Sequence, residues 1–534
     1  MERTGERSKD AERTSGDTRL LAAPAAAQFV VVLSTSVVNV ALPPIRDSMT
    51  LSDTDTAWVV NAYGLAFGAL LLLGGRAADL AGARRVLVAG LGLFAVASVA
   101  AGLAATPWLL IGARAAQGLA AAAAAPAALA LLVRLFPPGA GRARALGAWG
   151  AVSGAGGAAG VLLGGALTEA FGWPWIFHAC AFGAALTLTA ALRLLPPDAR
   201  LADHGAHGGR REGSVRLGDP GRPGGVGRPG GVGRPGGVGR PRADVLGALS
   251  VTTAIVALVH GLTAARGPGW TDPYILGTLT AAGALTLLFL RTERHHPDPL
   301  VPRGLLRQGL VAPANLLTAL LGAVWAGLFF FLPLLQQQVL GASVLTAGLT
   351  QIPLALAANM LGAALAPRLD GRFGPYRTLA GGFLLQAAGS TWLAFLSTPG
   401  TSAITLTGPT VLIGLGLGIA FVQLTAAAVG GVRPADAGAA GGLVNTSRQL
   451  GGAVGIALLG TLATALTAVP SADVGSGGAA GLAEVHRTAF LLVALLAAAA
   501  TALTPLLSRR AVATRAVALP AADTPTSHGT PHDS

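Results

Sequence analysis

Arg114 is the residue in this sequence that most needs a polar environment, because its charged side chain lies within a long apolar stretch. The stretch reads Arg114-Ala-Ala-Gln117-Gly118, with alanine and leucine on both sides. A charge near the centre of a membrane helix costs about 2.5–3.5 kcal/mol on insertion scales, so the guanidinium should face a polar cavity or a partner. The alternative is a structural role, in which the side chain snorkels or pairs with a neighbour.

Uncharged polar side chains within apolar runs form a second group of candidates. Amides can orient a neutral or mildly polar ligand through hydrogen bonds, although hydrogen bonding between helices is the alternative for each of them. Trp325 and Phe329–Phe331 could contact a lipophilic ligand or lipid. The residues predicted to line a ligand cavity are Asn39, Tyr63, Gln117, Gln351, Asn359, Asn445 and Arg448. We expect no metal site and no cofactor.

The composition requires these residues to be positioned by membrane helices. The 534 residues are 52% hydrophobic and 11% charged, whereas an ordinary soluble chain carries about 25% charged residues. This balance excludes a soluble enzyme, a coiled coil and a disordered chain, and predicts an all-α polytopic membrane protein. The net charge of +13 comes almost entirely from arginine in short segments between apolar runs, which is a topology signal, so no nucleic-acid partner is expected.

Fourteen apolar runs are long enough to cross the hydrocarbon, which takes roughly 20 residues. They lie near 24–43, 56–75, 86–105, 109–133, 145–168, 175–195, 244–263, 273–291, 311–334, 345–366, 378–397, 404–429, 438–467 and 487–507. Placing the N-terminus inside puts most loop arginines on the cytoplasmic side, and an even number of spans puts the C-terminus there too. We therefore expect a multi-pass protein of the cell (inner or plasma) membrane, surrounded by lipid, with both termini cytoplasmic.

The spans divide the chain into segments around one long internal loop. The loop carries a six-residue repeat, Gly-Arg-Pro-Gly-Gly-Val, and cannot build a packed core. Arg76, Gly82 and Arg85 recur at one constant offset as Arg368, Gly374 and Arg377, which supports two related halves. The predicted segments are a cytoplasmic tail (1–20), a six-helix bundle (21–195), a disordered cytoplasmic linker (196–243), two additional helices (244–291), a second six-helix bundle (311–507) and a disordered cytoplasmic tail (508–534).

The loop after the second span has a pattern that points to a known family. Gly75, Asp79, Gly82, Arg84 and Arg85 form a tight, charged turn. In this position the pattern resembles the signature loop of the major facilitator superfamily, which implies a conformational latch made by these five residues. A plain positive-inside hairpin is the alternative. The Arg114 stretch resembles the family's fourth-helix motif, which implies a role of Arg114 in proton coupling.

The fifth span is rich in glycine at helical spacing. Gly156, Gly160 and Gly164 are four residues apart, so they share one helix face and permit close packing or sliding; Gly165 follows directly. The position resembles the antiporter signature of the same family, although Val161 stands where the family has proline. Packing alone is the alternative reading.

Several further stretches resemble the fourteen-helix drug/proton antiporter branch of this family. They are Val38-Asn39-Val40-Ala41-Leu42-Pro43, Trp58-Val59-Val60-Asn61-Ala62-Tyr63 and Asn445-Thr446-Ser447-Arg448-Gln449-Leu450-Gly451-Gly452. The resemblance implies two six-helix bundles plus two extra helices, with alternating access of a central cavity. It also implies that the chain is a monomeric transporter, not an enzyme, and exports lipophilic small molecules such as antibiotics in exchange for protons.

One departure from the branch bears on proton coupling. Ser34 follows Leu33 in the first span, where many branch members have aspartate. A proton carrier needs a group whose pKa the transport cycle can change. The spans contain no acid deep inside, which leaves Asp79, Glu169, His178 and His260; we favour Glu169, because an outer half-channel would wet it.

The scarcity of acids also bears on the substrate and on rival functions. A permanent dication would lack a counter-charge, so neutral or weakly charged substrates are expected. A metabolite transporter, working in either direction with different or no proton coupling, is one alternative. A membrane-embedded transferase is another, but such enzymes need clustered carboxylates or a His-Asp pair, and the sequence shows none.

Overall fold

The apolar runs of the chain fold into long helices, because a backbone in lipid can satisfy its hydrogen bonds only internally. In the computed structural model, residues 2–136, 140–197, 244–264, 271–296, 299–301, 303–430, 432–433, 436–467, 478–505 and 507 are described. Every regular element in these ranges is helical, which confirms the all-α expectation. The predicted linker (196–243) and C-terminal tail (508–534) lie almost wholly outside the described residues.

The helices before and after the linker form three groups. The first half of the chain contains α1 (Glu2–Met49), α2 (Asp53–Ala81), α3 (Ala83–Gly102), α4 (Pro107–Leu135), α5 (Ala140–Phe171) and α6 (Pro174–Leu194). The pair α8 (Val245–Ala264) and α9 (Pro273–His295) follows. The second half contains η1 (Leu305–Arg307), α10 (Val311–Leu334), η2 (Leu335–Val339), α11 (Val344–Leu356), η3 (Ala357–Gly362), α12 (Ala363–Phe373), α13 (Pro375–Phe395), η4 (Ala403–Leu406), α14 (Thr407–Val429), α15 (Ala437–Leu466) and α16 (Gly478–Leu503).

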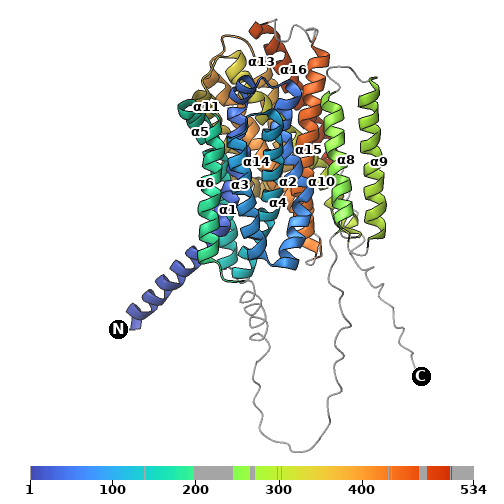
Figure 1. Cartoon of the computed structure of the whole chain (residues 1–534). Helices are drawn as coiled ribbons and strands as arrows, with labels where there is room; N and C mark the ends of the chain where they lie inside the picture. The colour runs from blue at the N-terminus through green and yellow to red at the C-terminus, as the bar shows by residue number, and fades with distance from the viewer. Residues whose placement is uncertain are drawn as a thin grey trace, which may run out of the picture.

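Ten segments in the described ranges are long and apolar enough to cross a membrane. They are Leu20–Met49, Ala83–Gly102, Pro107–Leu135, Pro174–Leu194, Pro273–His295, Val311–Val339, Val344–Phe373, Ala403–Val429, Ala439–Leu466 and Ala480–Leu503. The chain is therefore a multi-pass membrane protein. Several helices are longer than the predicted spans, because a helix can continue past the hydrocarbon. The helix α1 begins at Glu2 and projects from the bundle (Figure 1).

The helix ends follow local sequence signals. The Ser52 side chain accepts a hydrogen bond from the Asp55 N–H at 3.1 Å and caps α2. Thr106 caps α4, with Pro107 in its first turn, where a missing N–H costs nothing. Gly82 separates α2 from α3 with a φ of 98°, a conformation that L side chains rarely adopt.

Two π-helical segments interrupt the second half: η2 directly follows the predicted span 311–334, and η3 lies within the predicted span 345–366, where a regular helix was expected. The segment η2 begins two residues after Pro333, and η3 begins four residues after Pro353. In η2 the Leu340 N–H bonds the Leu335 carbonyl at 3.1 Å, five residues back, which is the wider register of a π-helix.

The bundle has two ends, which we name by the chain segments that lie there. The N-terminal face carries the start of α1 and the Gly82 turn, and the distal face carries the turns after Met49 and Phe171. The pair α8 and α9 stands at the edge of the bundle, beside α2 and α15 (Figure 1). Val259 and Leu262 pack there with Leu65 and Ala457, which attaches the pair to both halves of the chain.

Candidate functional site

The Arg114 side chain is buried where α1, α2 and α4 meet, with 1% of its surface exposed. It donates from Nε to the Val59 carbonyl at 3.1 Å, and from one terminal nitrogen to Ser34 Oγ at 3.2 Å and Gln117 Oε1 at 2.9 Å. Its guanidinium carbon lies 4.5 Å from the centre of the Tyr63 ring. The charge is thus held by neutral acceptors and a ring face, which offsets part of its desolvation.

A chain of hydrogen bonds fixes the partners of Arg114 in turn. Gln117 Nε2 donates to Ser98 Oγ at 2.7 Å, and Ser98 donates to the Phe94 carbonyl at 2.7 Å. The Tyr63 hydroxyl donates to the Val31 carbonyl at 3.1 Å. Ser98 was not among the predicted residues; its only signal was a serine within an otherwise apolar run. The buried Cys180 thiol lies beside Ser34.

The predicted latch residues gather at the Gly82 turn on the N-terminal face. Arg84 donates to the carbonyls of Leu192 and Leu195, both at 3.0 Å, so it covers the C-terminal end of α6. Arg76 donates to the Pro299 carbonyl. The Asp79 side chain lies outside the described part of the structure. The arginines therefore join the turn to two other segments, a role that sequence spacing did not indicate.

The α5 glycines meet the neighbouring helices at backbone distance. A Cβ atom added at Gly156, Gly160 or Gly164 would lie 2.7–2.9 Å from carbonyl oxygens of α1. A Cβ added at Gly165 would lie 3.0 Å from the backbone of α11. The first three share one helix face, as the four-residue spacing predicted; the structure shows that this face meets α1, whereas Gly165 meets the second half.

Glu169 lies at the distal end of α5 and is exposed. Its Oε2 accepts a hydrogen bond from the Leu345 N–H, at 2.8 Å, in the first turn of α11. Close by, Gln337 Nε2 donates to the Val40 carbonyl at 2.9 Å. These bonds join the two halves of the chain at the distal face.

The remaining polar candidates are distributed over several places. Gln351 is fully buried and donates to Gln336 Oε1 at 3.0 Å, beside η2. Asn359 donates to the Ala355 carbonyl at 2.9 Å and packs against Gly154. Asn39 is partly buried on α1. Asn445 and Arg448 lie together on α15, where Arg448 donates to Asn445 Oδ1 at 2.9 Å.

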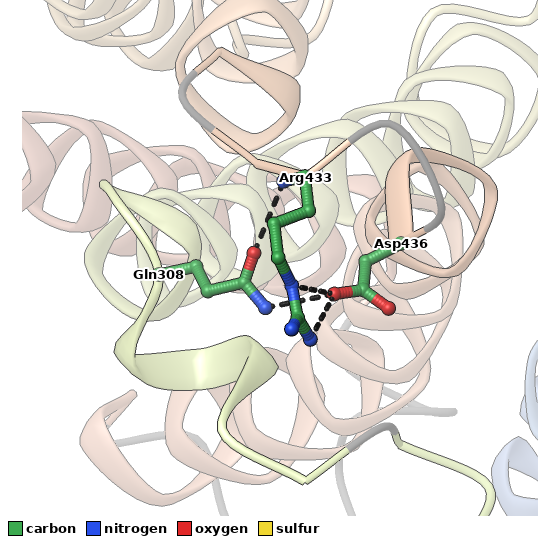
Figure 2. A network of polar contacts seen from close by, with 3 residues as sticks. All are labelled: Gln308, Arg433 and Asp436. Atoms are coloured by element: carbon green, nitrogen blue, oxygen red, sulfur yellow. Dashed lines mark hydrogen bonds and ion pairs between the residues drawn. The ribbon is translucent and has the colours of Figure 1, made fainter.

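A polar network on the N-terminal face ties the loop before α15 to the segment before α10 (Figure 2). Gln308 donates to Asp436 Oδ2 at 2.8 Å and accepts from the Arg433 N–H at 3.1 Å. Arg433 forms an ion pair with Asp436 at 2.7 Å. The hydrogen bonds from Gln308 and Arg433 stabilise the ionised carboxylate and lower the pKa of Asp436 below its usual value.

Long apolar helices around a buried charged centre define a polytopic membrane transporter, and comparisons with known proteins agree. The model of the Major Facilitator Superfamily matches residues 25–224 and 243–456. The chain therefore belongs to the major facilitator superfamily; it is a transporter and not an enzyme.

Two relatives and one solved structure illustrate the match. The puromycin resistance protein pur8 of Streptomyces alboniger is 38% identical over 80% of this chain and 78% of its own. The cephamycin export protein CmcT of Amycolatopsis lactamdurans is 36% identical over 84% of this chain and 85% of its own. A crystal structure of an auto-inhibited POT family peptide transporter shares the fold, with a TM-score of 0.63, 18% identity, and coverage of 93% of this chain and 97% of the other.

Proposed function

We propose that this transporter exports lipophilic small molecules, including antibiotics, in exchange for protons. Relatives that span most of the chain carry the names of two chemically different antibiotics, puromycin and cephamycin. The structural observation that carries the proposal is Arg114, a buried charge at the junction of α1, α2 and α4. Such charges inside membrane bundles mark substrate and ion pathways.

The proposed topology has fourteen crossings: the ten segments given above and the helices α2, α5, α8 and α13. The first and second halves form two six-helix bundles, and α8 and α9 are additional helices. Arginines gather at the N-terminal face, as at Arg76, Arg84 and Arg85, which supports a cytoplasmic location of that face and of both termini. We propose that the protein works as a monomer in the cell membrane.

The proposed cycle alternates access between the two faces. The bonds of Glu169 to α11 and of Gln337 to α1 close the distal face, which corresponds to an inward-facing state if that face is external. A proton arriving at Glu169 would neutralise the carboxylate and weaken its bond to the Leu345 N–H. Opening would then involve sliding of the α5 glycine face on α1 and rearrangement of the Gly75–Arg85 turn, with substrate held by the cavity residues.

Efflux of a fluorescent lipophilic dye from cells tests the proposal. Cells with the wild type should extrude the dye, and a protonophore should stop extrusion. Arg114→Ala should lower the rate at least tenfold, because it removes a charge and leaves the Ser34, Gln117 and Val59 acceptors unpaired. Arg193→Ala, at the exposed end of α6, is the matched control and should extrude like wild type.

One observation favours a second candidate function, a metabolite transporter without proton coupling. Ser34 offers Arg114 a hydroxyl where a titratable carboxylate would carry protons. Extrusion that continues after the protonophore, or transport of a polar metabolite without dye transport, would favour this candidate. Glu169→Gln separates the two, because only the proton antiporter should lose its pH dependence.

A further inference from the structure

Arg448 lies against two aromatic rings in the second half of the chain. Its guanidinium carbon lies 5.3 Å from the ring centre of Trp325 on α10 and 5.9 Å from that of Phe421 on α14. The two rings approach each other edge to face, with centres 6.5 Å apart. All three side chains are partly buried, so each keeps some accessible surface.

The backbone around Arg448 fixes the direction of its side chain. A Cβ atom added at Gly322 would lie 2.0 Å from the Arg448 carbonyl oxygen, so α10 and α15 touch at their backbones here. This contact brings Arg448 within reach of Trp325, one turn further along α10. The guanidinium is thus positioned by packing and not by a charged partner.

The hydrogen-bonding capacity of Arg448 is only partly used. One terminal nitrogen donates to Asn445 Oδ1 at 2.9 Å, whereas the buried Nε has no partner among the described residues. No carboxylate in the described ranges forms an ion pair with this guanidinium. A buried donor without a partner is costly, so the Arg448 side chain favours a ligand that accepts hydrogen bonds.

The Arg448 side chain points toward α10 and α14, and the same helix, α15, also contacts the first half of the chain. Arg448 interacts electrostatically with Tyr63, whose ring is covered by the Arg114 guanidinium at 4.5 Å. On the same helix, Thr446 donates to the Gly68 carbonyl of α2 at 3.0 Å. Neither guanidinium has a carboxylate partner among the described ion pairs, and an anion bound beside Arg448 would offset its charge.

We propose that Arg448, Trp325 and Phe421 form the recognition site for a carboxylate carried by an aromatic substrate. A planar guanidinium binds a carboxylate through parallel hydrogen bonds, while the neighbouring rings can stack on the ring system of the ligand. The proposal rests on the proposed function, since it names the substrate class of that transporter. It differs from the sequence-based expectation of neutral or weakly charged substrates, because it adds lipophilic substrates that carry one carboxylate.

Binding of two matched probes to the purified full-length protein tests this site. The probes are 1-pyrenebutyrate and its methyl ester, which differ in the carboxylate and share the ring; quenching of tryptophan fluorescence reports binding. Wild type should bind the carboxylate about tenfold more tightly than the ester, as expected for a charge-assisted hydrogen bond. Arg448→Gln should bring this ratio to about one and leave ester binding intact, which also shows that the variant is folded.

Three further variants sharpen the result. Arg448→Lys should keep part of the ratio, because it retains the charge without the planar fork. Phe421→Leu should weaken both probes by about threefold to tenfold and leave the ratio unchanged. The matched control is Arg487→Gln, whose guanidinium also covers a ring, Phe395, at 5.6 Å but is exposed on α16; it should bind like wild type.

The outcomes separate this site from the proposed function, because binding is measured without transport. Equal binding of both probes by wild type, or an unchanged ratio in Arg448→Gln, overturns the site, even if cells still export the neutral ester. Carboxylate selectivity without any efflux overturns the proposed export instead. A competition experiment tells whether the site prefers an aromatic acid or a fatty acid. The aromatic 1-naphthylacetate should displace 1-pyrenebutyrate better than the fatty acid decanoate does. Equal displacement by the two acids overturns the proposal that the site recognises an aromatic substrate.

Discussion

Ser34 lies at the position on α1 that meets the Arg114 guanidinium, 3.2 Å from one terminal nitrogen. A carboxylate at this position would pair with the Arg114 guanidinium, which is already buried in the wild-type protein. Introducing it therefore adds only the desolvation of the carboxylate, and the ion pair offsets much of that cost. The same carboxylate elsewhere on α1 would have no such partner. The neighbourhood of Arg114 therefore determines which acid substitutions the first helix tolerates.

We predict that Ser34→Asp keeps the thermal stability of the purified protein close to that of wild type. Ser36→Asp is the matched control, because Ser36 faces the α5 glycines and no arginine; it should destabilise the fold by roughly 3 kcal/mol. Thermal unfolding in detergent measures both. Ser34→Asp should also extend dye efflux to cations, and equal destabilisation by the two substitutions would contradict the prediction.

Arg114 could be predicted from the sequence, because a charged residue within an apolar run is recognisable from the order of residues alone. Its partners were less visible, because Ser34, Ser98 and the Val59 carbonyl come from three other helices and their meeting depends on helix rotation. Arg448 was predicted to line the cavity, but its position between two rings depends on the packing of α10, α14 and α15.

At the scale of elements, the contact of α5 with α1 depends on the absence of side chains. A Cβ atom at Gly160 would lie 2.8 Å from both the Leu33 carbonyl oxygen and the Ser36 Cβ. Backbone oxygen cannot move aside as a side chain does, so the two helices would have to separate by several tenths of an ångström.

We predict that Gly160→Ala destabilises the protein by about 1–3 kcal/mol and lowers the rate of dye efflux about tenfold. Gly283→Ala on α9 is the control, because an added Cβ there meets nothing within 4 Å. Thermal unfolding and efflux rates measure the two effects. Wild-type efflux by Gly160→Ala would show that α5 and α1 do not need this close approach.

The sequence predicted most helices because a membrane requires long apolar runs, and their hydropathy is local information. It did not predict η2 and η3, because a π register is a hydrogen-bond pairing of the folded backbone that hydropathy does not encode. Nor did it place Arg84 at the end of α6, since this bond joins residues far apart in the chain.

At the scale of the whole molecule, the segment 299–308 connects the two halves at the N-terminal face. Arg76 of α2 donates to the Pro299 carbonyl at one end, and Gln308 bonds Arg433 and Asp436 at the other. Glu293 at the end of α9 accepts from the Val301 N–H at 2.5 Å between them. The segment therefore bonds to α2, to α9 and to the loop before α15.

We predict that the Gln308–Arg433–Asp436 network loses its contribution to stability in acid. Because the pKa of Asp436 is lower in the folded protein, its contribution is complete above the ordinary carboxyl pKa and disappears as the pH falls through the lowered value. Asp436→Asn should unfold at a lower temperature than wild type at pH 7, and the difference should disappear at an acid pH below the lowered pKa of Asp436.

Thermal unfolding at both pH values measures the effect. Asp47→Asn, an exposed substitution at the end of α1, is the control and should match wild type at each pH. A deficit of Asp436→Asn that persists in acid would show that the carboxylate charge does not hold the network together.

Because Cys180 is buried, cysteines introduced elsewhere in the natural chain could be labelled selectively for spectroscopy. This single thiol lies inside the first half with 1% of its surface exposed, so maleimide reagents should leave it unlabelled in the folded protein. Cysteines introduced in pairs across the distal face would then carry spin labels or fluorophores at defined positions. Distances between such labels would follow the opening of that face during turnover, without first removing native cysteines.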